Sequence, residues 1–294
     1  MLKLDGVSKV YRTGTFGGKL LRAVDNVSFD VADGEVLALI GESGSGKTTL
    51  GKMILRLAGI DGGTITFDGT DITTYRGRAL KEYYRRVQGV FQDPFSSYNP
   101  IFKADRVFRL VREEFFPGMG GEAWADKVHA ALHSVGLNPE HVLSKFPHQL
   151  SGGQLQRFLI ARALLLDTRV LVADEIISML DASTRIDVLN LLADLRDKGL
   201  SILFITHDLS LAYYISDRVV ILQRGQVVEM GATERVFKNP LHNYTRMLLG
   251  CVPRIDAKWS NVQLPEIAGQ PPDGAGEPAI LIEAEGEHFV AAAG

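Results

Sequence analysis

Several features are scarce in this sequence of 294 residues, and each scarcity excludes a class of protein. One cysteine, Cys251, allows neither an intrachain disulfide framework nor a four-cysteine metal cluster. The longest apolar runs, such as 36–40 and 202–205, are far shorter than the roughly 18 residues that a membrane-spanning helix needs. The opening stretch MLKLDGVSKV has no apolar segment of the signal-peptide kind. We therefore expect a reduced, cytosolic environment.

An excess of positive charge is also missing. The net charge is −3, with both signs spread along the chain, which argues against a protein that coats nucleic acid. Lysine and arginine are absent after Lys258, where Pro, Gly, Glu and Ala dominate. The sequence thus predicts a domain over residues 1–250 and an acidic, weakly specified extension over 251–294. Within the extension, AILIEAEGEHFVA (279–291) is compatible with a hairpin, and we expect the residues beyond about 259 to contribute little to the chemistry.

Two kinds of strand pattern occur within residues 1–250. Apolar residues alternate with polar ones at Val27, Phe29 and Val31. The same pattern recurs over 62–72, and together they predict an antiparallel subdomain. Short continuous apolar runs, each followed by polar residues and a helical stretch, predict strands buried on both faces of a mostly parallel sheet. These runs lie in EVLALIGESGSGKTTL, VQGVFQD, RVLVADE and SILFITHD. Between them, residues 94–166 favour a helical insertion, so the fold class is α/β.

The stretch GESGSGKTT (41–49) fits the pattern G-x-x-x-x-G-K-[ST] between a strand and a helix. Its backbone N–H groups would hold β- and γ-phosphate oxygens, Lys47 would neutralise them, and the Thr48 hydroxyl would bind Mg²⁺. A glycine-rich turn that only joins strand to helix is the alternative. The motif indicates a P-loop NTPase core, a class that includes kinases and GTPases. The residues of this loop expected to bind nucleotide are Gly41, Ser43, Gly44, Ser45, Gly46, Lys47, Thr48 and Thr49.

Polar residues follow three further strands. In open α/β sheets ligands bind beyond the carboxyl ends of the strands. There, Asp174 suits a partner of Mg²⁺ and Glu175 suits a base for the attacking water. His207 could donate a hydrogen bond to the γ-phosphate, and the Gln92 amide could contact both Mg²⁺ and water. Taken alone, each of these residues could equally be a polar residue at a helix start or in a loop, with no catalytic role. Their common position at the ends of strands favours a catalytic site.

A second glycine pair lies in LSGGQ (150–154), directly before a helical run. Such a helix start binds anions well, although Ser151 also suits a simple N-cap. With this motif the chain resembles the ATP-binding subunits of ABC transporters over residues 2–250. The resemblance rests on an ordered set of motifs: the aromatic Tyr11, the P-loop, Gln92, LSGGQ, Asp174–Glu175, SMLD (178–181) and His207.

The resemblance implies a role for each remaining motif. Tyr11 would stack on adenine, unless it only packs on a strand surface. Two cassettes would close head-to-tail, so that LSGGQ holds the γ-phosphate of an ATP bound on the partner, and Asp181 would lie near that site. The cross-chain residues are Ser151, Gly152, Gly153 and Gln154.

Two stretches, FQDPFSSYNP and NPLHNYTRMLL, resemble the dipeptide, oligopeptide and nickel importer branch, which also imports short oligosaccharides. The cysteine-rich segment of many relatives is missing, so no iron–sulfur cluster is implied. Ile176, Ile177 and Met179 stand where the family usually has Pro, Thr and Ala. Because the spacing from Glu175 to Asp181 is kept, we expect the chemistry to survive, while coupling between the two ATP sites is left open.

The resemblance implies an ATP-hydrolysing subunit, with ATP and Mg²⁺, that energises import of an oligopeptide or short oligosaccharide. It implies as partners a second cassette, identical or homologous, two membrane permeases and an extracytoplasmic solute-binding protein, with no nucleic acid. The protein would lie peripherally on the cytoplasmic face of the cell membrane.

Two other classes of ATPase fit the sequence less well. A DNA-repair ATPase needs a long coiled-coil insertion, for which the interval between Gln92 and Leu150 is too short, and translation ATPases usually carry two cassettes. A degenerate regulatory cassette is disfavoured by Glu175 and His207.

Overall fold

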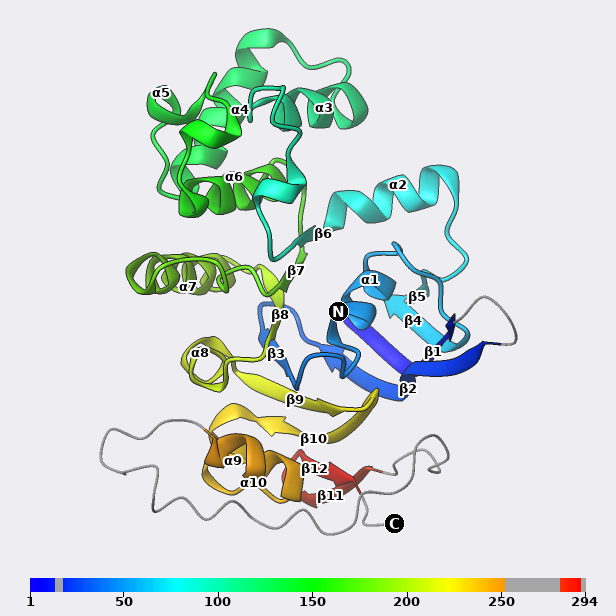
Figure 1. Ribbon diagram of the computed structural model, residues 1–294. Coiled ribbons are helices and arrows are strands. Elements are labelled where there is room, and N and C mark those ends of the chain that lie inside the picture. Colours follow the sequence, from blue (N-terminus) through cyan, green and yellow to red (C-terminus); the bar gives the residue numbers. More distant parts are fainter. Residues whose placement is uncertain (14–17, 252–280, 292–294) are drawn as a thin grey trace. The chain divides into compact units, whose positions relative to one another are not determined.

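The computed structural model describes residues 1–13, 18–251 and 281–291, and it divides into two compact units. Unit 1 comprises Met1–Tyr75 and Leu203–Gly294, whereas unit 2 comprises Arg76–Ile202. The boundary falls inside strand β8 (Ser201–Thr206). Most of the extension expected from the sequence, residues 252–280, lies outside the described residues. Figure 1 labels the elements of both units.

Unit 1 contains the expected antiparallel subdomain, a sheet with the order β2-β1-β4-β5. Val27, Phe29 and Val31 are buried, whereas the intervening Ser28 and Asp30 are only partly buried, so the alternation marks the inner face. The turn after β4 has a positive φ at both Asp68 and Gly69, as a tight two-residue hairpin requires. The strands are β1 (Leu2–Thr13), β2 (Lys19–Val31), β4 (Gly62–Phe67) and β5 (Thr70–Asp71).

The second sheet of unit 1 has the order β11-β12-β10-β9-β3-β8. Strand β3 is buried at all five residues, as its continuous apolar run predicts, and it pairs in parallel with β9. Beyond β9 the pairing is antiparallel through β10, β12 and β11, so this sheet is mixed at one edge. The strands are β3 (Val36–Ile40), β9 (Arg218–Gln223), β10 (Gln226–Ala232), β11 (Leu281–Glu285) and β12 (His288–Ala291).

Strands β11 and β12 are the hairpin with which 279–291 is compatible. It pairs with β10 through Glu229 opposite Val290 and Met230 opposite Phe289, so this part of the extension continues the sheet (Figure 1). The helices of unit 1 are α1 (Lys47–Ile54), α8 (Leu209–Ile215), α9 (Thr233–Lys238) and α10 (Asn243–Gly250). Residues of α8, α9 and α10 pack with β3, β9 and β10 in one buried cluster.

Unit 2 contains a parallel strand pair and the expected helical insertion. Strands β6 (Val87–Val90) and β7 (Val170–Asp174) pair with Val87 opposite Val170. Between them in sequence come α3 (Arg106–Phe115), α4 (Gly121–Ser134), α5 (Pro139–Val142) and α6 (Gly152–Leu164). The buried rings of Phe108 and Phe158 stack at 4.4 Å between α3 and α6. Helices α2 (Gly77–Arg86) and α7 (Ala182–Asp197) complete the unit. None of the helices in the described ranges is long and apolar enough to cross a membrane.

Candidate functional site

The phosphate-binding motif lies in unit 1, in the loop between β3 and α1. Gly44 and Gly46 have φ values of 82° and 104°, a left-handed region that favours glycine. A Cβ at Gly41 would lie 2.2 Å from the Leu222 carbonyl oxygen, and one at Gly46 would lie 2.3 Å from that of Ala23. The glycines of the motif therefore allow both the turn and the close approach of the loop to neighbouring backbone.

Lys47 and Ser45 are buried within this loop, at 5% exposure each. The Lys47 ammonium donates hydrogen bonds to the carbonyl oxygens of Gly41, at 2.7 Å, and Glu42, at 2.8 Å. The Ser45 hydroxyl has no hydrogen-bond partner in the part of the chain that the structure describes. A buried polar atom without a partner is costly, and a phosphate oxygen would satisfy this one. The loop thus fits an anionic ligand.

Two further predicted residues belong to unit 1. His207 is exposed and follows the fully buried strand β8. It precedes Asp208, whose carboxylate caps α8 by accepting from the backbone N–H groups of Ser210 and Leu211. Tyr11, on β1, is 38% exposed, and the Lys9 ammonium lies 5.4 Å from its ring centroid. Because β3 and β8 are neighbours, the P-loop and His207 follow adjacent strands.

Gln92, Asp174 and Glu175 belong to unit 2. They follow β6 and β7, adjacent parallel strands, so they share the carboxyl edge of that pair. Asp174 is buried and Gln92 is exposed. Glu175 has a φ of 51°, uncommon for a residue with a side chain, and its carbonyl oxygen accepts from both the backbone N–H and the hydroxyl of Ser178. The backbone after β7 is therefore closely defined.

The three unusual residues after Glu175 have different surroundings. Ile176 and Ile177 are buried, at 1% and 2% exposure, and so contribute to the apolar interior of unit 2. Met179 is 62% exposed. The structure therefore accounts for the two isoleucines by packing, whereas nothing in it explains Met179.

The LSGGQ residues (150–154), hereafter the signature motif, begin helix α6 with a capping box. The Ser151 hydroxyl accepts from the Gln154 N–H, and the Gln154 side chain accepts from the Ser151 N–H. A Cβ at Gly153 would lie 2.4 Å from Cγ2 of Thr184, whereas a Cβ at Gly152 would meet only ordinary contacts. Capping and close packing thus explain Ser151, Gly153 and Gln154 within one chain, and a role toward a partner remains a prediction.

Asp181 caps α7 in a similar way. Its carboxylate accepts from the Ser183 hydroxyl and from both the backbone N–H and the hydroxyl of Thr184. These hydrogen bonds, that of Ser183 first, hold the pKa of Asp181 well below its usual range. The side chain is therefore ionised, and its carboxylate oxygens already accept hydrogen bonds from the first turn of α7.

Two contacts of the motifs involve residues that the sequence did not indicate. Arg162 of α6 donates to the Gly89 carbonyl oxygen at 2.8 Å and so joins the signature helix to the strand before Gln92. The Tyr244 hydroxyl of α10 accepts from the Glu42 N–H of the P-loop at 3.1 Å. The helical pattern around Tyr244 predicts its helix but gives no signal of what the helix contacts.

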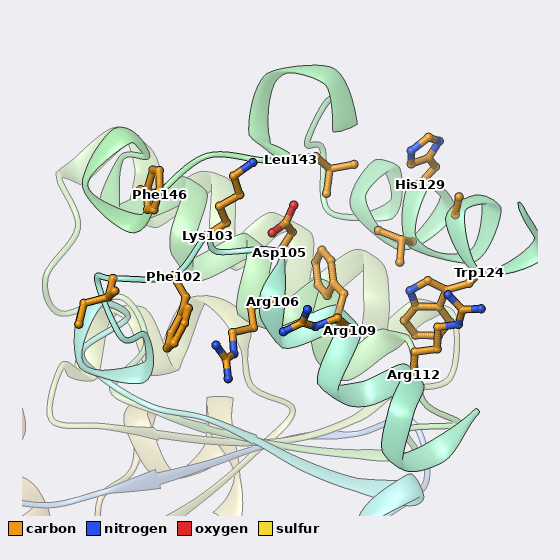
Figure 2. A pocket seen from close by; sticks show the side chains of 14 residues that line it. Phe102, Lys103, Asp105, Arg106, Arg109, Arg112, Trp124, His129, Leu143 and Phe146 are labelled. Atoms are coloured by element: carbon orange, nitrogen blue, oxygen red, sulfur yellow. The ribbon is translucent and has the colours of Figure 1, made fainter. Parts of the chain in front are cut away.

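The helical part of unit 2 carries a cavity of about 570 Å³. Figure 2 shows its lining, which includes both aromatic and cationic side chains. Asp105 is the acidic residue among those that line it, and its carboxylate accepts from the Ser144 N–H. The Arg106 guanidinium lies 3.6 Å from the Phe102 ring centroid. The cationic residues are Lys103, Arg106, Arg109 and Arg112, and the aromatic ones include Phe102, Trp124 and Phe146.

The α/β fold and the P-loop together define a nucleotide-binding protein. Comparison with known proteins identifies its family. The family model "ABC transporter" matches residues 24–178, and the model "Oligopeptide/dipeptide transporter, C-terminal region" matches 228–279. The chain belongs to the ABC transporter family, as its ordered motifs indicated, and is an ATP-hydrolysing cassette of that family.

Two curated relatives are similar over most of their length. A putative peptide import ATP-binding protein of Brucella ovis is 43% identical over 258 residues, which cover 87% of this chain and 80% of the relative. The oligopeptide transport ATP-binding protein OppF of Streptococcus mutans is 39% identical over 300 residues, covering 99% of this chain and 94% of the relative. Among solved structures, a dimeric post-hydrolysis state of the ATP-binding cassette MJ0796 bound to ADP and Pi gives a TM-score of 0.70 at 29% identity, covering 79% of this chain and 99% of that one.

Proposed function

We propose that this protein hydrolyses ATP to drive import of a small peptide through partner membrane permeases. The observation that carries the proposal is the P-loop, where Lys47 is buried across two carbonyl oxygens and Ser45 holds a hydroxyl without a partner in the described residues. Both groups support the proposal, because a buried ammonium and an unpartnered hydroxyl in a glycine-rich loop can bind a phosphate.

In the proposed reaction the loop N–H groups and Lys47 hold the β- and γ-phosphates, and Tyr11 stacks on adenine. Glu175 accepts a proton from the attacking water, which approaches the γ-phosphate in line. His207 donates a hydrogen bond to the developing charge on that phosphate. The left-handed backbone at Glu175 supports this assignment, because such conformations are concentrated at functional sites.

Thr48, Gln92 and Asp174 would hold Mg²⁺. Bound Mg²⁺ neutralises charge on phosphate oxygens. The three side chains offer hydroxyl, amide and carboxylate oxygens, the donors that this ion prefers. Over residues 1–13, 18–251 and 281–291 no group of three or more His, Cys, Asp or Glu could form a metal cage. Mg²⁺ is usually held by one or two carboxylates together with substrate phosphates.

A second cassette, identical or homologous, would complete each ATP site head-to-tail. Similar solved structures are described as dimeric cassettes, which supports pairing of two cassettes. In the head-to-tail arrangement, Ser151 and the start of α6 would face the γ-phosphate bound by the partner, with Gly152, Gly153 and Gln154, and Asp181 would lie beside it. The capping box leaves the first N–H groups of α6 without intrahelical partners, as at any helix start, and these can bind an anion.

The cavity of unit 2 would receive a short cytoplasmic helix of a permease. A lining that combines four cationic residues with aromatic ones favours a helix with one apolar face and acidic flanks. The protein would then lie peripherally on the cytoplasmic face of the membrane, in a complex with two permeases and an extracytoplasmic solute-binding protein. Peptide as the solute is supported by the names of the relatives and by the match to 228–279.

Transport by the assembled complex tests the proposal. Vesicles containing permeases and cassettes should take up labelled peptide when ATP is supplied on the cassette side, and Lys47→Ala in the cassettes should abolish uptake. Peptide uptake that persists with Lys47→Ala would refute an ATP-driven role. Uptake of oligosaccharide but not peptide would instead refute the proposed solute class.

A further inference from the structure

Tyr244, in the first turn of α10, contacts the P-loop through a single peptide unit. Its hydroxyl accepts from the Glu42 N–H at 3.1 Å. The carbonyl on the other side of the same peptide unit belongs to Gly41, and it accepts from the Lys47 ammonium at 2.7 Å. Because a peptide unit is planar and rigid, rotation at one end moves the other. Tyr244 and Lys47 therefore form hydrogen bonds to opposite sides of the same Gly41–Glu42 peptide plane.

Tyr244 can act as a firm support because its ring is 5% exposed and belongs to the buried cluster of β3, β9 and β10. Burial raises the pKa of Tyr244, so the hydroxyl is neutral at physiological pH. The N–H of Tyr244 donates to Nδ1 of His242 at 3.1 Å, which caps the helix. Burial also lowers the pKa of His242, and the neutral ring can accept this bond.

Glu229 anchors the segment that precedes α10. This fully buried residue of β10 accepts from the N–H groups of Leu241, at 2.9 Å, and His242, at 3.0 Å. Its Oε1 also lies 2.7 Å from Nε2 of His288 in β12. One carboxylate thus joins the C-terminal hairpin to the turn that carries Tyr244. The sequence predicted little contribution of the extension to ATP chemistry, and this contact gives a physical reason to measure it.

We propose that Tyr244 is a positioning residue for the P-loop, and that Glu229 holds Tyr244 in place. The proposal rests on the proposed role of the loop in binding ATP. Loss of the tyrosine hydroxyl frees the Gly41–Glu42 peptide to rotate, and the Lys47 ammonium then loses one of the two carbonyl oxygens that orient it. The expected consequence is weaker phosphate binding by a loop that is otherwise intact.

Tyr244→Phe in the full chain tests this directly, because the ring stays and only the hydroxyl is removed. We expect the Kd for ATP in the presence of Mg²⁺ to rise about three- to tenfold, the range of one net hydrogen bond. Tyr213→Phe is the matched control, since Tyr213 is 44% exposed on α8 and contacts Phe237 instead. Binding is measured by titration at a temperature at which thermal scans show all variants fully folded.

Under those conditions the Kd for ATP and the melting temperature of Tyr244→Phe distinguish a positioning role of the hydroxyl from a purely structural one. A lower melting temperature for Tyr244→Phe with an unchanged Kd would overturn the proposal. Lys47→Ala serves as a second reference: if it also left ATP affinity unchanged, the assignment of the loop would fail, independently of Tyr244.

Glu229→Gln tests the second part. The amide offers one acceptor oxygen in place of two, so an N–H of Leu241 or His242 loses its partner and the turn loosens. We expect Glu229→Gln to raise the Kd for ATP, and the double variant with Tyr244→Phe to bind no more weakly than the weaker single variant, because both act through the same contact. Additive losses in the double variant would overturn the role assigned to Glu229.

Discussion

Glu175, the proposed general base, also has an unusual backbone conformation. Its left-handed φ of 51° is held by two hydrogen bonds from Ser178 to its carbonyl oxygen, so the side chain leaves the end of β7 in a fixed direction. A strained conformation persists only where the surroundings enforce it. A substitution that changes the carboxylate alone, without changing branching or size, therefore isolates the chemistry.

We expect Glu175→Gln to keep ATP affinity and to slow hydrolysis by roughly 10²–10⁴, as for loss of a general base. With hydrolysis blocked, ATP should also trap a closed pair of cassettes. Steady-state ATPase rates, ATP titration and size-exclusion chromatography give the three readouts. Near-normal turnover in this variant would remove Glu175 from the mechanism.

The signature motif needs a more careful substitution, because Gly153 is in close contact with its own chain. An aspartate there would clash with Cγ2 of Thr184 whatever the partner does. Thr184→Ser removes that methyl group but keeps the hydroxyl that donates to Asp181 at 2.8 Å. The double change Gly153→Asp with Thr184→Ser therefore places a charge at the start of α6 without the steric effect.

In this background we expect the isolated subunit to bind ATP normally and the assembled transporter to lose hydrolysis. Two negative charges about 4 Å apart cost roughly 4 kcal/mol at an intermediate effective dielectric, enough to oppose closure on a partner's γ-phosphate. Gly153→Asn with Thr184→Ser is the uncharged control and should keep most of the activity. If the charged variant instead lost ATP binding as an isolated subunit, the motif would serve its own chain.

The sequence predicts some of these residue-scale features and not others. The turn of the P-loop was recognisable because the spacing of its glycines encodes it, whereas the roles of its residues toward phosphate stay predictions. LSGGQ was recognisable as a motif, but the sequence could not show that Thr184, some thirty positions later, forbids a side chain at Gly153. Nor could it reveal Tyr244, since a buried tyrosine in a helix gives no sign of the backbone it contacts.

Among the elements, helix α10 has a cap that depends on protonation. Nδ1 of His242 accepts from the Tyr244 N–H only when that nitrogen is unprotonated. Burial lowers the pKa of His242, as does Arg246, whereas Glu229 raises it. A histidine with a depressed folded pKa contributes stability above its unfolded pKa of about 6.5, and this contribution is lost as pH falls below that value.

We therefore expect the free energy of unfolding to fall between pH 7.5 and 5.5, in part through His242. His242→Asn keeps a capping oxygen but does not titrate, so its stability should depend less steeply on pH. Urea unfolding of both proteins at the two pH values measures the difference. Equal pH dependence in the two proteins would show that the cap is not the titrating group.

The elements themselves were predictable to different degrees. Continuous apolar runs indicated β3, β7 and β8, because strands buried on both faces leave a strong pattern. The hairpin of β11 and β12 was indicated too, but not that it pairs with β10. Pairing between strands about sixty residues apart depends on which edge is available, and alternation within each strand carries no such information.

At the level of the whole molecule, the motifs are divided between two units. Unit 1 carries the P-loop and His207, whereas unit 2 carries Gln92, Asp174–Glu175 and the signature motif. The sequence indicated the helical insertion but not this division. The second boundary lies inside the continuous apolar run of β8, so no change in the sequence pattern marks it. The cationic cavity lies wholly in unit 2, so a partner that binds there contacts the unit that carries the proposed base.

We expect Arg109→Glu to weaken coupling between ATP hydrolysis and import without changing ATP affinity of the isolated subunit. Arg109 lines the cavity and is 62% exposed, so the reversal should affect an acidic partner helix by about 1 kcal/mol, a few-fold in affinity, rather than the fold. Arg78→Glu, at an exposed site on α2, is the control. Transport measured in vesicles at low and high salt should show a defect for Arg109→Glu only; equal defects would argue against docking in the cavity.

Cys251 follows α10 directly and is exposed, and it is the chain's single cysteine. A maleimide dye will therefore attach at one known position without prior removal of other thiols. That position is at the far end of the helix whose first turn carries Tyr244. Fluorescence from this one site can follow, in real time and in the otherwise unaltered protein, whether α10 responds when nucleotide enters the loop.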